Sequence, residues 1–204
     1  MKHSDRLLNL LKASGKEYVS GEAISKDLGI TRAAVWKEIQ ALKNLGYGIS
    51  ALTHRGYRLL SVPDKLFADE IQYGLRTEKV GKRIFSYETL DSTNSVAARL
   101  GDEGLPEGVC VFAEYQKKGR GRLGRTWSSP KGQGILFSVL LRPELAPSEV
   151  SRLTLMAAVA VIRAIEGVTG LKPAVKWPND VVHEGKKLCG ILTEMSGEID
   201  REFA

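Results

Sequence analysis

The first 45 residues carry apolar side chains at the spacing of helices, in three groups. Leucines at positions 7, 8, 10 and 11 predict a first helix over 3–13 with one buried face. A short second helix is predicted from Ser20-Gly21 to the turn at Gly29-Ile30, and a third is predicted from its cap at Thr31 to about residue 45. Two helices joined by a brief glycine-containing turn are the signature of a helix-turn-helix.

The third predicted helix has two different sides. At about 100° per residue, one side is apolar. That side consists of Val35, Ile39, Leu42 and Leu45, and the other consists of Ala33, Trp36, Lys37, Gln40 and Asn44. Amide and ammonium groups suit the major groove of DNA, where Gln reads adenine and Lys reads guanine or phosphate. An ordinary solvated face and a protein–protein module of the same geometry are the alternatives.

Alternating segments at 47–52 and 56–59 predict a strand pair around the turn Thr53-His54-Arg55-Gly56. The pair completes a winged helix-turn-helix domain over residues 1–60, with a cationic tip placed to touch phosphate. The candidate DNA-contacting residues are Gly21, Thr31, Arg32, Ala33, Trp36, Lys37, Gln40 and Arg55.

The charge distribution supports a DNA-binding module at the amino-terminal end. Residues 1–60 hold ten Lys/Arg against five Asp/Glu, whereas residues 61–204 hold twenty against nineteen. The chain has no apolar run near the roughly 18 residues of a membrane span, and no signal peptide. Cys110 and Cys189 are isolated and form no metal-binding pattern with histidine, so we expect a cytoplasmic protein with reduced thiols and no membrane partner.

The remaining chain reads as a connection followed by a second domain. Residues 61–64 break the pattern, and 65–77 show a loose helical pattern expected to dock on the second domain, so 61–81 is assigned as linker and docking helix. Residues 82–204 contain mostly strands, a few helices and no strict βαβ alternation, which favours an α+β domain with a mixed or antiparallel sheet. The predicted strands are 84–87, 109–116, 134–142, 174–177, 181–183 and 186–195, and the predicted helices are 95–100 and 148–168.

A loop rich in glycine and arginine, residues 119–127 (GRGRLGRTW), follows the apolar strand at 109–115. No acidic residue occurs between Glu114 and Glu144. A glycine-rich backbone can approach a ligand closely, and arginines supply planar donors for phosphate or carboxylate, so this loop is predicted to hold an anion. Dinucleotide-binding and P-loop motifs both need a helix directly after the last glycine, and Pro130, Gly132 and Gly134 argue against a helix there. A solvated basic loop is the plain alternative.

Four segments together resemble the biotin–protein ligases, and in particular the bifunctional members that also repress the biotin operon. They are Asp91-Ser92-Thr93-Asn94, the loop at 119–127 with Glu114-Tyr115-Gln116 before it, Lys176-Trp177-Pro178-Asn179-Asp180, and Lys186-Lys187-Leu188-Cys189-Gly190-Ile191-Leu192. The resemblance implies that 82–204 is a catalytic domain similar to class II aminoacyl-tRNA synthetases. Biotin, ATP and Mg²⁺ are the ligands that it implies.

The resemblance also assigns roles to individual residues. It makes Arg120 and Lys187 catalytic, and it places no certain metal ligand. The implied biotin-binding residues are Ser92, Thr93, Asn94, Gln116, Arg120, Gly121, Arg122 and Lys187, and the implied ATP-binding residues are Arg122, Trp127, Asn179 and Asp180. Read from the residues alone, Ser92 could simply cap a helix and Lys187 could be a solvated lysine on a hairpin.

The implied activity is formation of biotinyl-5′-adenylate and transfer of biotin to a lysine of a biotin carboxyl carrier protein, such as that of acetyl-CoA carboxylase. The adenylate would also be the corepressor of a homodimer bound to operator DNA. A non-catalytic, biotin-sensing transcription factor is the alternative. Members of the family continue beyond the position of Ala204 through further strands, so the catalytic domain is expected to be incomplete here, with weakened ligase activity and a tendency to aggregate.

Overall fold

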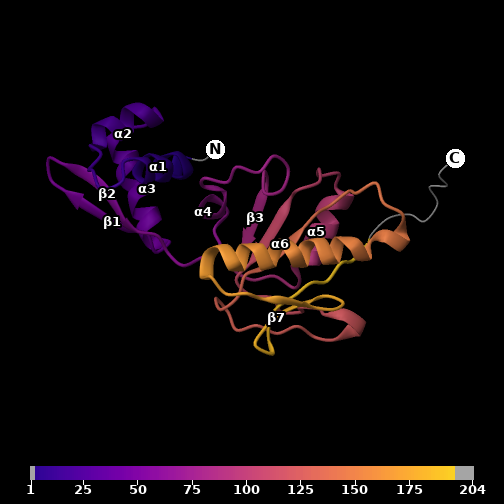
Figure 1. The fold of residues 1–204 in the computed structure, drawn as a ribbon. Coiled ribbons are helices and arrows are strands. Elements are labelled where there is room, and N and C mark those ends of the chain that lie inside the picture. The colour runs from indigo at the N-terminus through magenta and orange to yellow at the C-terminus, as the bar shows by residue number, and fades with distance from the viewer. Residues whose placement is uncertain (1–2, 196–204) are drawn as a thin grey trace. The chain divides into compact units, whose positions relative to one another are not determined.

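The computed structural model describes residues 3–195, and the chain divides into two compact units, Met1–Gly74 and Leu75–Ala204 (Figure 1). The sequence-based boundaries at residues 60 and 82 stay predictions.

The first unit contains the predicted three helices and strand pair. Its elements are α1 (His3–Ala13), α2 (Gly21–Leu28), α3 (Arg32–Asn44), β1 (Gly48–Leu52), β2 (Gly56–Ser61) and the short α4 (Ala68–Gln72). β1 and β2 are antiparallel. The core joins all three of the longer helices, since Leu7, Ile24, Val35 and Ile39 are fully buried. Burial of the apolar stripes against one another is what holds these short helices in place.

The caps of α2 and α3 form as the sequence indicates, but the side chain of the residue that follows α3 is placed differently from its prediction. Thr31 Oγ1 accepts a hydrogen bond from Ala34 N at 3.2 Å, and Gly29 ends α2 with a φ of 68°. Leu45, predicted to point inward, is 53% exposed. Leu45 follows the last helical residue and precedes Gly46, whose φ is 97°, so the backbone has already left the line of the buried stripe.

Gly56, at the turn end of the wing, lies against the segment before α2. Val19 and Tyr57 exchange two backbone hydrogen bonds at 2.8 and 2.9 Å, which brings Val19 O close to the start of β2. A Cβ on Gly56 would lie 2.1 Å from Val19 O, and its φ is 107°. Gly56 is therefore required by both the close approach and the backbone conformation.

We expect Gly56→Ala to destabilise the first unit by about 3 kcal/mol or more, because it adds a backbone clash to a strained φ. Gly15→Ala is the matched control, since Gly15 has a φ of 58° but no atom within 4 Å of its added Cβ. That control is expected to cost about 1–2 kcal/mol, the cost of the left-handed φ alone. Denaturant unfolding followed by circular dichroism measures both, and equal losses would contradict the role given to the clash.

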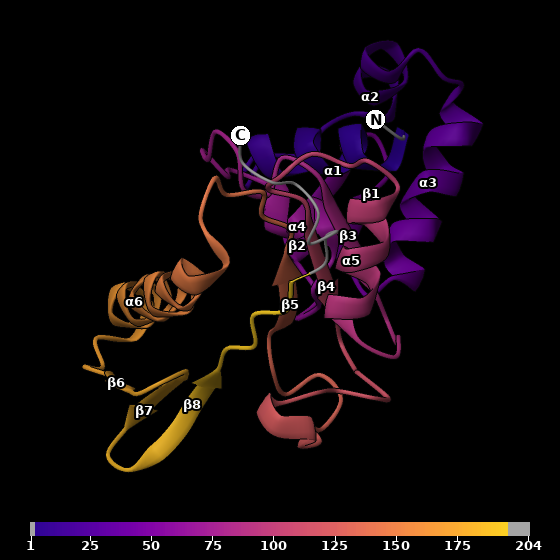
Figure 2. The same ribbon diagram turned by 90° about the vertical axis from the view of Figure 1, so that its right-hand side faces the viewer.

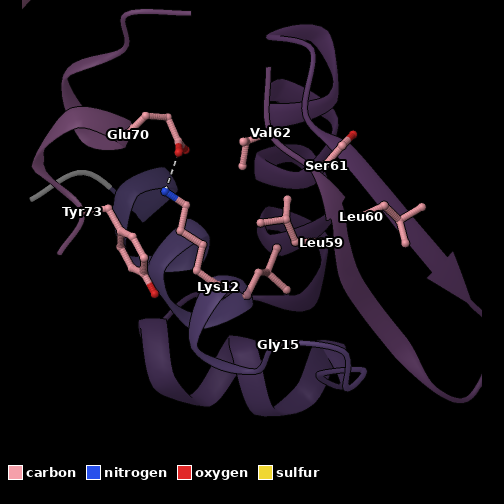
Figure 3. Close-up of a pocket in the computed structure, with 9 residues that line it drawn as sticks. Lys12, Gly15, Leu59, Leu60, Ser61, Val62, Glu70 and Tyr73 are labelled. Atoms are coloured by element: carbon pink, nitrogen blue, oxygen red, sulfur yellow. Dashed lines mark hydrogen bonds and ion pairs between the residues drawn. The ribbon is translucent and has the colours of Figure 1, made fainter. Parts of the chain in front are cut away.

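α4 lies in the first unit and packs on α1 and on the residue that precedes β1, whereas its docking on the second domain stays a prediction. Lys12 Nζ lies 2.7 Å from Glu70 Oε2, and Tyr47 OH donates to Glu70 Oε1 at 2.8 Å. The Tyr47 and Phe67 rings stack with centroids 6.2 Å apart. This carboxylate lowers the cost of burying Lys12. Burial raises the pKa of Tyr47, and the hydrogen bond to Glu70 raises it further. Figure 3 shows Lys12 and Glu70 at an open pocket whose lining includes none of the predicted site residues.

The described part of the second unit, residues 75–195, contains two three-stranded sheets. In the first, β3 (Ile84–Tyr87) is parallel to the central β4 (Cys110–Ala113), and β5 (Leu136–Val139) is antiparallel to β4. In the second, β6 (Ala174–Lys176), β7 (Asp180–His183) and β8 (Lys186–Gly190) are antiparallel neighbours in that order. The mixed first sheet confirms the α+β prediction.

Helices α5 and α6 lie against these sheets (Figure 2). α5 (Thr93–Asp102) packs on the first sheet, where Ala97 and Leu100 join Val109 and Val111 in a buried cluster. α6 (Ser151–Thr169) contacts β6 and β7. Short 3-10 turns occur at η1 (Arg122–Gly124) and η2 (Pro147–Glu149). Among residues 3–195, no helix is both long enough and apolar enough to cross a bilayer.

β8 is shorter than the strand predicted at 186–195. It ends at Gly190, and residues 191–195 form no regular element. Ile191 N still donates to Asn179 O at 2.9 Å, but the chain then turns toward α5, where the Asn94 side-chain amide donates to Leu192 O at 3.3 Å. Side-chain contacts thus replace the strand pairing that the apolar pattern suggested.

Candidate functional site

The loop at 119–127 lies in the connection between β4 and β5, and it folds back on itself. Trp127 N donates to Gly119 O at 2.8 Å, and Gly121 N donates to Arg125 O at 2.7 Å. A Cβ on Gly119 would lie 2.4 Å from Trp127 O, so the two ends of the loop meet only because residue 119 is glycine. Residues 128–130 have no regular secondary structure, which agrees with the exclusion of both helix-dependent phosphate loops.

A buried polar cluster lies at the start of α5, beside the strand that leads into the loop. Gln116 Oε1 accepts from Thr93 N at 2.7 Å and from Thr93 Oγ1 at 3.0 Å. Ser138 Oγ lies 2.8 Å from Thr93 Oγ1 and also contacts Asn94 Oδ1. Ser92 and Thr93 are almost fully buried. The structure therefore brings together the predicted head-group residues and holds their donors and acceptors in fixed directions.

Arg120 joins the loop to this cluster through a carboxylate that the sequence reasoning did not single out. Its Nε and Nη2 donate to the Glu194 oxygens at 3.1 and 2.9 Å, and its Nη1 donates to Ser95 Oγ at 2.9 Å. Asn94 Nδ2 donates to Glu194 Oε2 at 3.0 Å. These groups form one connected network of charge-assisted hydrogen bonds.

The network shifts the pKa values of both partners. The hydrogen bond to Glu194 raises the pKa of Arg120, and the hydrogen bond from Arg120 lowers the pKa of Glu194, with a further lowering by Asn94. Because the pKa of Glu194 is lowered in the folded chain, the ion pair stabilises the fold at pH values above the ordinary pKa of a glutamate. That stability is lost as the pH falls through the lowered pKa. The pair is therefore intact at neutral pH.

The other end of the loop meets the β7–β8 hairpin. Lys187 Nζ lies 2.7 Å from Asp180 Oδ1 and 5.1 Å from the centroid of the Trp127 ring. The contact with Asp180 is an ion pair without hydrogen-bond alignment, since Asp180 Oδ1 has no hydrogen bond within residues 3–195. A Cβ on Gly190 would lie 3.0 Å from both Lys187 Nζ and the Trp127 ring, so this glycine leaves room for their approach.

Arg122 completes this second group. Its Nη1 donates to Asn179 Oδ1 at 3.3 Å, and Asn179 Nδ2 donates in turn to Ile191 O at 3.0 Å. Arg122 is exposed and makes a longer contact than Arg120 does, which leaves most of its guanidinium donors available for an anion. The predicted nucleotide residues thus lie on the loop and at the start of β7, and Lys187 of β8 lies next to two of them.

In the first unit, the predicted DNA-contacting residues lie mostly on exposed surface. Trp36 is 55% exposed, Lys37 is exposed beside it, and Gln40 is partly exposed. Thr31, Arg32 and Ala33 are exposed at the start of α3, and Gly21 is partly buried against Tyr57. Arg55 at the turn of the wing lies with Cζ 4.9 Å from the Tyr18 ring centroid.

Comparison with known proteins agrees with both units. The model of the biotin/lipoate A/B protein ligase family matches residues 86–201. The chain belongs to this family. A helix-turn-helix domain model matches residues 4–58. Members of the ligase family are also among the relatives and solved structures that the chain resembles.

The "Bifunctional ligase/repressor BirA" of Bacillus subtilis is 44% identical over 195 residues, which are 96% of this chain and 60% of the relative. The protein of the same name from Escherichia coli is 36% identical over 95% of this chain and 58% of its own length. The chain therefore spans about three fifths of the length of these relatives. A solved biotin protein ligase from Aquifex aeolicus, in complex with biotin and ATP, matches with a TM-score of 0.50 and 38% identity, over 56% of this chain and 47% of that one.

Three polar residues of the site were not predicted from the sequence or from its resemblance to the ligases. Ser138 is the single hydroxyl within the apolar segment 134–142, and that break in the pattern is the signal that could have marked it. Ser95 follows the matched segment at 91–94, and Glu194 follows the matched segment at 186–192. Nothing in their spacing predicts that Arg120 connects them.

Proposed function

We propose that this chain activates biotin with ATP, donates it to a lysine of a biotin carboxyl carrier protein, and represses transcription from operator DNA. The observation that carries the proposal is the position of the 119–127 loop. Its first arginine is bonded to residues next to the buried head-group cluster, and its Trp127 lies against Lys187 of β8. A site for an uncharged polar ring and a site for a nucleotide are thus connected by cationic groups.

In the first step, an oxygen of the biotin carboxylate attacks the α-phosphorus of ATP, the bond to the bridging oxygen breaks, and pyrophosphate leaves. Two anions must approach each other, so positive charge placed around them lowers the barrier. Arg122 and Lys187 supply that charge, and Trp127 offers a face for the adenine. Ser92, Thr93, Asn94 and Gln116 would hold the ureido ring of biotin through paired donors and acceptors.

In the second step, the amine of the carrier lysine attacks the acyl carbon of biotinyl-adenylate and AMP leaves. Closure of the site around the mixed anhydride keeps water away from it. Gly121 allows the backbone to approach the ligand, and Arg120 holds the loop near the carboxylate. Transfer then requires that the carrier reach the same opening.

A magnesium ion would enter with the nucleotide. Among residues 3–195, no group of three or more His, Cys, Asp or Glu side chains could hold a metal ion by itself. Magnesium commonly binds one or two carboxylates together with substrate phosphates, and Asp180 fits that limited role. Bound in this way, the ion would neutralise phosphate charge.

The α3 face and the wing tip form the proposed DNA-binding surface. Helix-turn-helix proteins commonly bind as dimers to paired half-sites, so we propose a homodimer on the operator, with biotinyl-adenylate as corepressor. The basic excess in residues 1–60 supports the same surface.

The ligase proposal is tested with the purified chain, biotin, Mg²⁺ and ATP labelled at the α-phosphate. We expect labelled biotinyl-adenylate and an equal amount of pyrophosphate, followed by loss of the label as AMP when a carrier domain is added. Binding of biotin without release of pyrophosphate would instead support a non-catalytic sensor.

The repressor proposal is tested by selecting duplexes that bind the chain from a random pool, with and without biotin and ATP. An equal yield of bound duplex in both conditions would remove the corepressor role.

A further inference from the structure

Tyr18 lies on the short segment between α1 and α2 that adds an edge to the wing sheet. The backbone of the next residue, Val19, exchanges two hydrogen bonds with Tyr57 of β2, and its side chain packs against the core of the first unit. Since successive side chains of an extended segment point to opposite faces, the Tyr18 side chain lies on the other face of the sheet. Its hydroxyl accordingly lies 3.0 Å from Ser50 Oγ, which follows the buried Ile49 on β1.

The Tyr18 ring contacts two arginines of the wing. Arg58 Cζ lies 4.7 Å from the ring centroid and Arg55 Cζ lies 4.9 Å from it, and both distances are within the range of cation–π contacts. Arg58 is held a second time, because its Nη1 donates to Lys16 O at 3.3 Å. Its Nε is buried and has no hydrogen bond among residues 3–195. Arg58 therefore belongs to the packing of the wing.

Arg55 is held in a different way. It lies exposed at the turn of the wing, and within residues 3–195 its guanidinium makes no hydrogen bond or ion pair. A guanidinium that is held over an aromatic ring keeps its five N–H donors for other partners. The ring thus restricts Arg55 and leaves it able to bind an anion through paired donors.

The residues around the ring are mainly cationic. Segments 16–20 and 50–58 contain Lys16, Arg55 and Arg58 against a single carboxylate, that of Glu17. Glu17 is exposed and forms no ion pair in the described part of the chain. A surface of this charge favours a polyanion, and in a helix-turn-helix unit the fitting polyanion is the phosphate backbone of a DNA duplex.

We propose that Tyr18 is a positioning residue that holds Arg55 ready for a phosphate of the DNA backbone. The inference rests on the proposed repressor function, and it extends the DNA-binding machinery to a residue outside α3 and the wing. An arginine side chain loses much rotamer entropy when it becomes ordered in a complex. Because the ring already restricts Arg55, less of that entropy is lost on DNA binding, and the affinity rises accordingly.

The opposite hypothesis is that the ring holds Arg55 away from the duplex. The two hypotheses predict changes of opposite sign. Loss of a positioning ring weakens DNA binding, whereas loss of a ring that competes with the phosphate strengthens it. The free donors of Arg55 and the cations beside it favour positioning.

The first test measures the DNA affinity of the full chain by fluorescence anisotropy, with one labelled duplex recovered from the selection and one of unrelated sequence. We expect Arg55→Ala to bind both duplexes about five- to ten-fold more weakly, and to lower the slope of log affinity against log salt by about one. Tyr18→Leu should bind about three- to five-fold more weakly, because Arg55 keeps its charge and loses its support. Tyr18→Phe keeps the ring and should stay within about two-fold of the unchanged chain.

The double variant shows whether Tyr18 acts through Arg55. Tyr18→Leu should weaken binding no further when it is added to Arg55→Ala, since both changes remove the same contact. Tyr73→Leu is the matched control, because the Tyr73 ring also lies near a cation of the first unit, with Lys12 Nζ 4.2 Å from its centroid (Figure 3). It should leave the affinity within about two-fold. A further loss in the double variant, tighter binding by Tyr18→Leu, or equal losses in Tyr18→Leu and Tyr18→Phe would overturn the positioning role.

The second test needs no DNA. In NMR spectra of the full chain, the ring current of Tyr18 should shift the side-chain protons of Arg55 away from their ordinary positions. The shift should persist in Tyr18→Phe and disappear in Tyr18→Leu. Ordinary Arg55 shifts in a chain that binds DNA would overturn the positioning role alone. If the unchanged chain bound no duplex at any salt concentration, the proposed repressor function would fail, and the phosphate contact of Arg55 would fail with it.

Discussion

Lys187→Ala is expected to lower the rate of biotinyl-adenylate formation by about 10²- to 10³-fold, the effect of removing one preorganised electrostatic stabiliser from an active site. The Lys187 ammonium is fixed between the Asp180 carboxylate and the Trp127 ring, where the loop meets β8. It would face the charge that develops as the biotin carboxylate and the α-phosphate combine. Pyrophosphate release at saturating biotin and ATP measures the change.

Lys186→Ala is the control for this prediction. Lys186 is the neighbouring residue on β8, is exposed, and carries the same charge, so its removal changes the net charge equally. Its rate should stay within about two-fold of the unchanged chain, as for most surface substitutions away from a site. Equal losses in the two variants would show that Lys187 acts through general charge and not through its position.

Most of the features that the sequence predicts correctly depend on residues that are close together along the chain. The helices of the first unit follow from leucine, valine and isoleucine at helical spacing, and Thr31 marks a helix start because its hydroxyl caps the next turn. The mixed sheet follows from short apolar runs without regular helix alternation. The loop at 119–127 is recognisable because its glycines and arginines are contiguous.

Contacts between distant residues could not be predicted in this way. α4 packs on the first unit through Lys12 and Glu70, which are 58 residues apart, and its apolar pattern alone does not show which surface it meets. Arg120 and Glu194 are 74 residues apart. Such pairs depend on how elements are placed in space, which the local periodicity of a single sequence does not contain.

The charge reversal Lys37→Glu is expected to weaken DNA binding by about 10- to 100-fold at moderate salt. It removes a cation from the exposed side of α3 and adds a carboxylate that the DNA phosphates repel. Lys37 lies beside Trp36 on the side of α3 opposite the buried Val35 and Ile39, so the substitution leaves the core of the first unit intact. Fluorescence anisotropy with a labelled duplex recovered from the selection measures the affinity. Biotin affinity and the unfolding midpoint should not change.

The salt dependence then shows what Lys37 contacts. If it binds a phosphate, Lys37→Ala should reduce the slope of log affinity against log salt by about one, and it should weaken binding to all duplexes alike. If it reads a base, the slope should change less, and the preference for one base at one position of the duplex should relax.

Lys172→Glu is the control for the charge reversal. Lys172 is an exposed lysine of the second unit, so its substitution changes the net charge by the same amount, and we expect it to leave the affinity for DNA within about two-fold. An equal loss in Lys37→Glu and Lys172→Glu would mean that the effect comes from net charge, and α3 would lose its assignment as the DNA-reading helix.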